Sequence, residues 1–315
     1  MPYKNNMKNK IRIVIATHKK IDYKLPKCYY PMQINCKNNK EHWAGFLHDD
    51  FGDNISIKNK SYCELTAHYN LWKNYEDDIK GLCHYRRFFS KGDSVLFQEF
   101  DTYQANKLSQ KIISEKEINK ILENYECIVA MPYRPFPSTE KQDILNYCYQ
   151  KDVDVLRKTI AEIEPDYLEA YDRVMDSMNL SHYNMLIARK KIFDEYSTWL
   201  FGILEKVENG TNIEFYDTQH KRIYGYFAEI LLNVYLLKNS INCKCLRIVE
   251  VAEHTGVSKK MYCSYLLKRI IISISKLILG EKVVNDVYRR KNKQFFERKI
   301  ACQNAVLSES RKKDN

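Results

Sequence analysis

The sequence contains no low-complexity run, no repeat of fixed period and no collagen-like or Pro/Ser-rich segment, and its 315 residues include only 9 glycines. These absences remove the usual sequence support for solenoid, fibrous and largely disordered proteins. A hydrophobic content of 44%, with 13% aromatic residues, is ample for a substantial core. We therefore expect a globular protein, built as one large domain or as two of ordinary size.

The short motifs of several enzyme and metal-binding classes are also missing. No stretch matches G-x-G-x-x-G, G-x-x-x-x-G-K-[ST], H-E-x-x-H or G-x-S-x-G. The ten cysteines include no C-x-x-C pair, the spacing that a structural zinc or a thioredoxin-like site needs. The basic N-terminus runs directly into the apolar residues 11–16, which are too few for the core of a signal peptide. We expect a cytoplasm-facing protein with reduced thiols.

The formal charge of +11 is concentrated near the C-terminus, where residues 259–315 hold 15 lysines and arginines against 5 acidic residues. Within this segment, residues 264–279 are rich in Leu and Ile but carry three charges, so they are too short and too polar to span a bilayer. We expect residues 262–299 to lie on the inner face of the cell membrane as a basic amphipathic helix. The alternative is a core-packing helix with a solvated basic end.

Short apolar runs alternate with helical periodicity, which is typical of an α/β protein. The run at 11–16 predicts a buried first strand that ends at Thr17 and His18, and the run at 79–83 predicts a second strand that ends at His84. Ligands of α/β sheets bind at the carboxyl ends of strands. Other elements are expected as strands at 126–131 and 245–251, helices at 61–75, 111–125, 141–174, 191–208 and 220–238, and an irregular segment at 24–48.

A dense polar stretch runs from His48 to Asn59. Such a loop, leading into the N-terminus of a predicted helix, suits the binding of a small polar ligand. The alternative is a surface Asx-turn with a helix N-cap, which uses the same residue types. The short hydrogen-bonding side chains of the loop are those of Asp49, Asp50, Asp53, Asn54, Ser56 and Asn59.

Two adjacent arginines, Arg86 and Arg87, follow the second predicted strand. The planar guanidinium group recognises phosphate oxygens through paired hydrogen bonds, so this position suits a nucleotide diphosphate. The alternative is a pair of salt bridges to the acidic loop at residues 49–53. His84 alone is more typical of a hydrogen-bonded core histidine than of a catalyst.

Glu229 is the one carboxylate on an otherwise apolar helical segment. A buried glutamate with a raised pKa would suit a general base that deprotonates an acceptor hydroxyl group. It could equally pair with Arg222 or with an arginine that follows His84. Tyr183 and Asn184 open another apolar stretch, where their polar groups would bind sugar hydroxyls or simply begin a strand.

These blocks together resemble a bacterial capsular-polysaccharide glycosyltransferase family that was long catalogued as a domain of unknown function. The resemblance covers roughly residues 10–250, in consistent order. The matching blocks are residues 50–56, Asn59, 62–66, 71–74, 81–89, 183–185, 199–201, Arg222 and 225–229.

The resemblance implies a GT-A-like nucleotide-sugar-binding fold, an α/β mixed sheet flanked by helices, which we place at residues 1–256. The basic amphipathic segment described above then forms a helical C-terminal extension at 257–315. The implied enzyme is a hexosyltransferase that moves a galactofuranosyl or other hexosyl group from a UDP-sugar. Glu229 as the base would make the transfer inverting. In that fold a strand near the sheet centre ends in Asp-x-Asp, which holds a divalent metal. Here the strand ends in His84-Tyr-Arg-Arg87 instead, so metal-independent catalysis is one option. The acidic residues 49–53 keep Mn²⁺ or Mg²⁺ as the other.

The departure from the family pattern is Ile230, which stands where we associate a basic residue. The expected roles place the nucleotide beside Thr17 and His18 and the diphosphate at Arg86 and Arg87. The remaining roles are the donor sugar at Asp50, Asp53, Asn54, Ser56 and Asn59, catalysis at Glu229 and His84, and a lipid-linked saccharide acceptor at Tyr183 and Asn184.

Two other classes compete with this interpretation. A non-catalytic protein that binds nucleic acid or another polyanion would use the basic tail, but such modules usually carry their charge on the folded domain, and here the body is nearly neutral. We therefore expect no nucleic-acid partner. A glycoside hydrolase would need two facing carboxylates, which sequence spacing does not exclude.

Overall fold

The computed structural model describes residues 9–39, 41–91, 101–102, 108–132 and 138–251, together with scattered positions between 267 and 303. The chain forms two compact units, each built from separate segments. Unit 1 contains Met1–Met131, Tyr183–Trp199 and Ser240–Ala252, and unit 2 contains Pro132–His182, Leu200–Asn239 and Glu253–Asn315.

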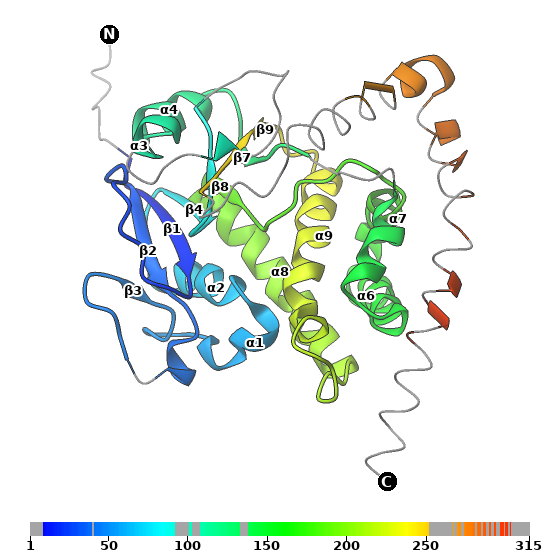
Figure 1. Ribbon diagram of the computed structural model, residues 1–315, viewed down its shortest axis with the longest axis horizontal. Helices are drawn as coiled ribbons and strands as arrows, with labels where there is room; N and C mark the ends of the chain where they lie inside the picture. The colour runs from blue at the N-terminus through cyan, green and yellow to red at the C-terminus, as the bar shows by residue number, and fades with distance from the viewer. Residues whose placement is uncertain are drawn as a thin grey trace. The chain divides into compact units, whose positions relative to one another are not determined.

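Unit 1 is built on a mixed sheet of ten strands (Figure 1). The parallel pairs are β2–β1, β1–β4, β3–β2, β9–β7 and β6–β10, whereas β8 runs antiparallel between β4 and β7. The short β5 runs antiparallel to both β4 and β10. The strands are β1 Ile11–Thr17, β2 Tyr29–Gln33, β3 Leu47–His48, β4 Ile79–His84, β5 Arg87–Phe89, β6 Asp101–Thr102, β7 Cys127–Ala130, β8 Leu186–Arg189, β9 Cys243–Leu246 and β10 Ile248–Glu250.

Both faces of the central strands are buried, which explains their nearly continuous apolar sequences. Ile13, Val14 and Ile15 of β1 are fully buried, although they point alternately to opposite faces of the sheet. Helix α2 contacts β1 and β4. The helices of this unit are η1 Cys36–Asn38, η2 Ser56–Lys58, α1 Asn59–Tyr62, α2 Leu65–Asn74, α3 Leu108–Lys111 and α4 Glu115–Ile121.

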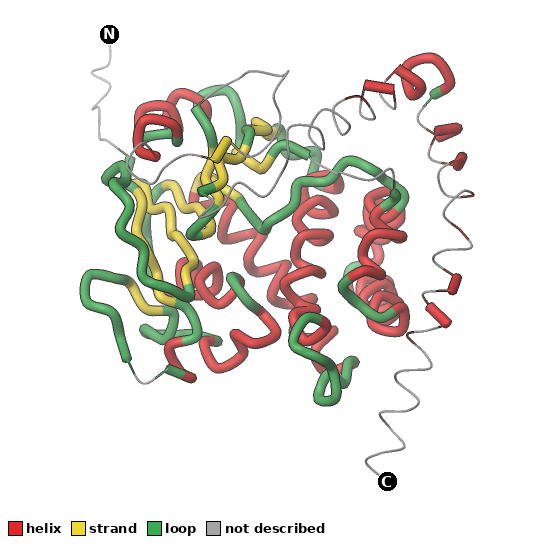
Figure 2. The backbone as a smooth tube through the Cα atoms, viewed as in Figure 1, coloured by secondary structure: helices red, strands yellow, loops and turns green. Residues whose placement is uncertain are grey.

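Unit 2 is helical in its described part, and α7 contacts both α6 and α9 (Figure 2). The boundary between the two units falls within the long helix α8, after Trp199. Buried Asp152 of α6 accepts a hydrogen bond of 2.7 Å from Tyr216, which joins two segments of this unit. The helices that lie wholly or partly in this unit are α5 Glu140–Asp143, η4 Ile144–Asn146, α6 Gln150–Ile163, η5 Pro165–Tyr167, α7 Leu168–Met175, α8 Lys190–Gly210, η6 His220–Arg222 and α9 Ile223–Lys238.

The predicted fold class is confirmed: the protein is a mixed α/β structure with helices beside its sheet. The prediction for residues 24–48 was wrong in part, because β2 and β3 lie within this segment. The helix predicted over 61–75 is divided into α1 and α2 at Cys63, whose φ of 51° does not continue a helix. The strand predicted at 245–251 is likewise two short strands, β9 and β10.

The described residues between 267 and 303 are helical except at Gly280. The predicted domain boundary at residue 256 lies outside the described residues, so it stays a prediction. Within the described part of the chain, every helix falls short of the length and apolar character that crossing a membrane would require.

Candidate functional site

The carboxyl ends of β1 to β4 lie at one edge of the unit 1 sheet, because these four strands are parallel to one another. The register places Thr17 beside Gln33, Gln33 beside His48, and Ala16 beside His84. Neighbouring strands are about 4.8 Å apart, so residues that directly follow these positions are close neighbours. The sheet therefore brings three predicted site segments to a common edge: Thr17 with His18, the acidic loop after His48, and the arginines after His84.

Two cationic side chains and a histidine ring surround the ring of Tyr85 at this edge. The ring of His18 meets it edge-on at 4.8 Å, and Lys19 Nζ and the Arg86 guanidinium each lie 5.1 Å from its centroid. Thr17 is fully buried and its hydroxyl donates to the Lys19 carbonyl oxygen at 2.5 Å, which fixes the turn that presents this cluster. Two positive groups held together on one aromatic platform attract an anion.

The two adjacent arginines have different surroundings. Arg86 is exposed, whereas Arg87 is half-buried, with its guanidinium 4.5 Å from the ring centroid of Tyr183 and 3.7 Å from Glu250 Oε1. Its Nε atom is buried and has no hydrogen-bond partner among the described residues. In the described part of unit 1, neither arginine forms an ion pair with Asp49, Asp50 or Asp53, so the alternative pairing with the acidic loop is wrong. Arg86 is the arginine that presents its guanidinium to solvent.

Tyr183 and Asn184 form a tight turn before β8, with φ values of 76° and 52°. The left-handed region is costly for residues other than glycine, and such conformations often occur at functional sites. His84 Nε2 lies 2.5 Å from the carbonyl oxygen of Tyr183, and Asn184 Nδ2 donates to Glu64 Oε1 at 2.7 Å in a buried position. His84 therefore holds the turn. Glu64, for which the sequence analysis predicts no role, holds it as well.

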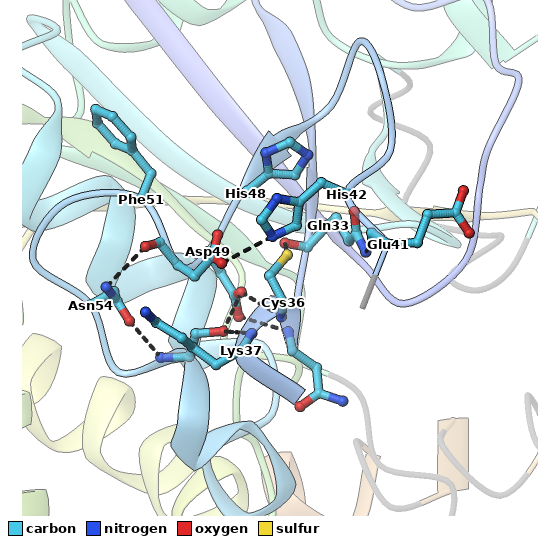
Figure 3. A network of polar contacts seen from close by, with 12 residues as sticks. Gln33, Cys36, Lys37, Glu41, His42, His48, Asp49, Phe51 and Asn54 are labelled. Carbon is cyan, nitrogen blue, oxygen red and sulfur yellow. Dashed lines mark hydrogen bonds and ion pairs between the residues drawn. The ribbon is translucent and has the colours of Figure 1, made fainter. Parts of the chain in front are cut away.

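The acidic loop is organised around the fully buried carboxylate of Asp49 (Figure 3). Oδ1 accepts hydrogen bonds from the Cys36 amide at 3.0 Å and the Ser56 hydroxyl at 2.6 Å. Oδ2 accepts from the Asn35 amide at 2.8 Å and the Thr66 hydroxyl at 2.6 Å. The position of Asp49 is therefore structural, because its carboxylate is surrounded by donors of the protein itself.

Other residues of this loop that were predicted to bind the donor sugar also form hydrogen bonds within the protein itself. Asn54 donates to the carbonyl oxygens of Asp50 and Gly52 at 3.0 and 2.7 Å, and its Oδ1 accepts from the Ser56 amide at 3.3 Å, which is the contact of an Asx turn. Asn59 donates to the Cys63 carbonyl oxygen at 2.7 Å, and Asp53 accepts from the Tyr69 hydroxyl at 3.2 Å. These contacts fix the shape of the loop, and a role for its side chains in binding a sugar stays a prediction.

Glu229 lies in unit 2 and pairs with a residue that the sequence analysis did not consider. Its Oε2 is 3.1 Å from His182 Nδ1, and both side chains are partly exposed, at 24% and 18%. Glu229 is therefore only partly buried, and Arg222, one of the partners considered for it, instead lies 5.6 Å from the ring centroid of Tyr226. His182 stands directly before the Tyr183 block, but a separation of 47 residues from Glu229 gave no sign of the pair.

Three side chains around the acidic loop could together hold a metal ion. One donor atom from each of Cys36, His42 and Asp50 lies within 4.8 Å of the others. Of the three aspartates predicted to keep a metal possible, Asp50 is the member of this group, while Asp49 and Asp53 make the contacts described above.

Comparisons with known proteins agree with the resemblance seen in the sequence. A search of solved structures matches the apo structure of the bifunctional glycosyltransferase WbbM, with a TM-score of 0.71 and 28% sequence identity. The match covers 78% of this chain but only 46% of that one, and this fold resembles a glycosyltransferase fold. A search of the curated proteins gives no match. The model of DUF4422, a domain of unknown function, matches residues 12–240, and the chain belongs to this family.

Proposed function

We propose that this protein is a GT-A-type glycosyltransferase that moves a hexosyl group from a UDP-sugar to a lipid-linked saccharide in capsule or surface-polysaccharide synthesis. The observation that carries the proposal is the cluster of Lys19, Arg86 and the His18 ring around Tyr85, at the carboxyl edge of parallel strands. The similarity to a bifunctional glycosyltransferase supports the same class of reaction.

In this proposal the cluster binds the donor's diphosphate. Arg86 supplies the exposed guanidinium fork, and Arg87, held between Tyr183 and Glu250, adds positive charge behind it. As the bond between the sugar and the diphosphate breaks, the leaving UDP gains negative charge, which fixed positive groups stabilise. His18 borders the nucleotide, while the buried Thr17 fixes the turn that presents it, and the loop from Asp50 to Asn59 surrounds the donor sugar.

Glu229 is the proposed general base. Its carboxylate takes the proton from the acceptor hydroxyl, whose oxygen forms the new bond to the anomeric carbon while the UDP leaves with its bonding electrons. One direct displacement of this kind inverts the anomeric configuration. His182 orients the carboxylate through its contact of 3.1 Å, while His84 positions the turn of Tyr183 and Asn184 that seats the acceptor.

Positive side chains at the diphosphate make the reaction independent of Mg²⁺ and Mn²⁺ in this proposal, since they supply the charge that such an ion would. An assay of sugar transfer with and without excess EDTA tests this step. Retained activity is expected, and a complete loss that Mn²⁺ restores would refute it.

Exposed apolar side chains on the helical segment near the C-terminus support association with the inner face of the membrane. Leu277 and Ile278 are 87% and 72% exposed, and an apolar surface beside basic residues binds anionic bilayers. The same exposure favours a membrane over nucleic acid as the partner of this basic segment. The other exposed apolar residues here are Leu267, Ile270, Ile271, Ile274, Leu279, Val283 and Val287.

A thermal-shift screen with UDP, UDP-galactose and UDP-galactofuranose tests the donor site, because a ligand that binds only the folded state raises the melting temperature. We expect a shift with wild type, and at least about 10-fold weaker UDP binding in Arg86→Ala, since a charge-assisted contact contributes about 1.5–3 kcal/mol. Arg157→Ala, which breaks an exposed pair with Asp172 at 2.7 Å, is the matched control. No shift with any uridine compound would contradict the proposal.

The base assignment is tested with Glu229→Gln, which keeps the size of the side chain. UDP binding is expected to stay unchanged while transfer falls about 100-fold or more, the usual contribution of a general base. Glu205→Gln, on the exposed side of α8, is the control. Transfer at the wild-type rate by Glu229→Gln would end the assignment.

Membrane association is tested by sedimentation with vesicles of phosphatidylcholine and phosphatidylglycerol. We expect wild type to sediment with the anionic vesicles and the double variant Leu277→Glu, Ile278→Glu to stay in solution. Ile163→Glu, which charges an exposed apolar residue of α6, should behave as wild type. Salt-sensitive RNA binding without affinity for the vesicles would favour the nucleic-acid alternative instead.

A further inference from the structure

We propose that Cys36, His42 and Asp50 form a binding site for a zinc-class transition-metal dication beside the carboxyl ends of β2 and β3. The three side chains supply one sulfur, one nitrogen and one oxygen donor, all within 4.8 Å of one another. Donor atoms on a tetrahedral zinc ion are about 3.5 Å apart, given metal–ligand bonds of about 2.0–2.3 Å. The side chain of His42 is half exposed, so a small rotation of its ring closes the difference.

Cys36 is held rigidly at this position. Its backbone amide donates to the buried carboxylate of Asp49 at 3.0 Å, and its Sγ donates to the carbonyl oxygen of Gln33 at 3.2 Å. Figure 3 shows the sulfur turned towards the ring of His42. A cation bound at this sulfur would displace the thiol proton.

His42 is positioned through both of its chain neighbours. The buried amide of Gln33 donates from Nε2 to the Glu41 carbonyl oxygen at 2.8 Å and accepts at Oε1 from the Trp43 amide at 2.8 Å. The ring of His42 also stacks on that of His48, with centroids 4.5 Å apart. Such supporting contacts around metal ligands orient them, and they commonly contribute 10–100-fold to affinity.

Asp50 completes the group from the other side of the loop. Its Oδ2 lies 3.0 Å from His42 Nε2, and its side chain is 14% exposed. Its backbone carbonyl oxygen accepts the hydrogen bond from Asn54. The side chains of Gln33, Asp49 and Asn54 thus support all three ligands without supplying a donor atom to the group.

The donor set selects the class of ion. A thiolate and an imidazole favour Zn²⁺ and similar transition metals, whereas Mg²⁺ is bound by oxygen atoms. Three protein ligands leave at least one coordination position for water or an oxygen of a bound molecule. The ion is therefore different in kind from the Mg²⁺ or Mn²⁺ considered at the diphosphate, and the inference does not depend on the proposed transferase activity.

Titration of the full chain with Co²⁺, an optical substitute for zinc, tests the inference without an activity assay. We expect a charge-transfer band in the near ultraviolet that reaches its limit at one equivalent, is displaced by Zn²⁺ and persists in millimolar Mg²⁺. Cys36→Ser should abolish the band. His42→Gln and Asp50→Asn should weaken binding by at least about 10-fold, in line with the effect of losing even a supporting contact.

Two controls separate loss of a ligand from other effects. Cys245→Ser removes a half-buried thiol outside the group, and Asp53→Asn removes an acidic side chain from the same loop; both should bind Co²⁺ as wild type does. His42→Gln changes a half-exposed residue, so its loss of binding remains interpretable if Cys36→Ser fails to fold. Absence of binding in wild type, a band that survives Cys36→Ser, or displacement by Mg²⁺ would overturn the inference.

Discussion

The carboxylate of Asp49 gives the sharpest test of how the loop at the sheet edge is built. Asp49→Asn keeps the size of the side chain but replaces one acceptor oxygen by a donor NH₂ group. Each carboxylate oxygen accepts one hydrogen bond from a backbone amide and one from a hydroxyl group. In either orientation of the Asn side chain, its NH₂ group therefore faces one backbone N–H and one hydroxyl group. The hydroxyl can rotate to accept, but the backbone N–H cannot.

The expected cost follows from this geometry. One buried donor without a partner costs about 1–3 kcal/mol, and the remaining hydrogen bonds lose the strength that the negative charge gave them. We expect Asp49→Asn to lower the free energy of unfolding of unit 1 by about 3 kcal/mol. Asp53→Asn, in the same loop, loses one exposed contact of 3.2 Å and should cost less than about 0.5 kcal/mol.

The assay is urea unfolding followed by tryptophan fluorescence. All three tryptophans, Trp43, Trp72 and Trp199, belong to unit 1, so the signal reports on the unit that contains Asp49. Metal-free buffer keeps the proposed ion from contributing to the measured stability. If the two variants unfold at the same urea concentration, the buried carboxylate does not organise the loop and the reasoning is refuted.

The same assay checks three further expectations in unit 1. Burial, and then the charge of Lys80, lower the pKa of His68 from 6.5 to about 3. Below pH 6.5 the unfolded state therefore binds the proton before the folded state does, and the free energy of unfolding falls by about 1.4 kcal/mol per pH unit. His68→Gln should lack this slope. The side chain of Lys80 is fully buried and lies 2.8 Å from Asp194. Lys80→Ala should lower the free energy of unfolding by about 3 kcal/mol, and Lys80→Met, which keeps the packing, should lower it much less. Gly81→Ala would place a Cβ atom 2.6 Å from a side-chain carbon of β8, and should lower the free energy of unfolding by about 1–3 kcal/mol. An unchanged unfolding midpoint in any of these variants would count against the stated cause.

Sequence periodicity predicted the elements whose burial is continuous. Residues 11–16 and 79–83 are apolar enough for buried strands, and both form strands at the predicted place. β2 was missed because Pro31 and two tyrosines hide its apolar pattern, yet Met32 and Gln33 are buried between β1 and β3. Pairing with neighbours that are distant in sequence decides such a strand, and its own residues carry little sign of it.

The sequence predicted which segments form the candidate site, but not which side chains pair within it. The family blocks around His84 and Asn184 do meet, through His84 with Tyr183 and Asn184 with Glu64. The partner of Glu229 could not be predicted, because helix α9 and the chain before β8 meet only through tertiary packing. Cys36 was not predicted because it belongs to no C-x-x-C pair. The other two residues of the proposed metal-binding group are 6 and 14 residues away in irregular loops.

The divided composition of unit 1 has a consequence for synthesis on the ribosome. The chain passes between the two units after residues 131, 182, 199, 239 and 252. Among the described residues, strand β7 pairs with β8 and β9, so both of its edges stay unpaired until residues 186–189 and 243–246 have been synthesised. At about 5–20 residues per second this delay lasts several seconds. The nascent protein therefore exposes unpaired strand edges, which favour aggregation, during that interval. A fragment that ends before residue 248 lacks β10 and cannot complete the sheet.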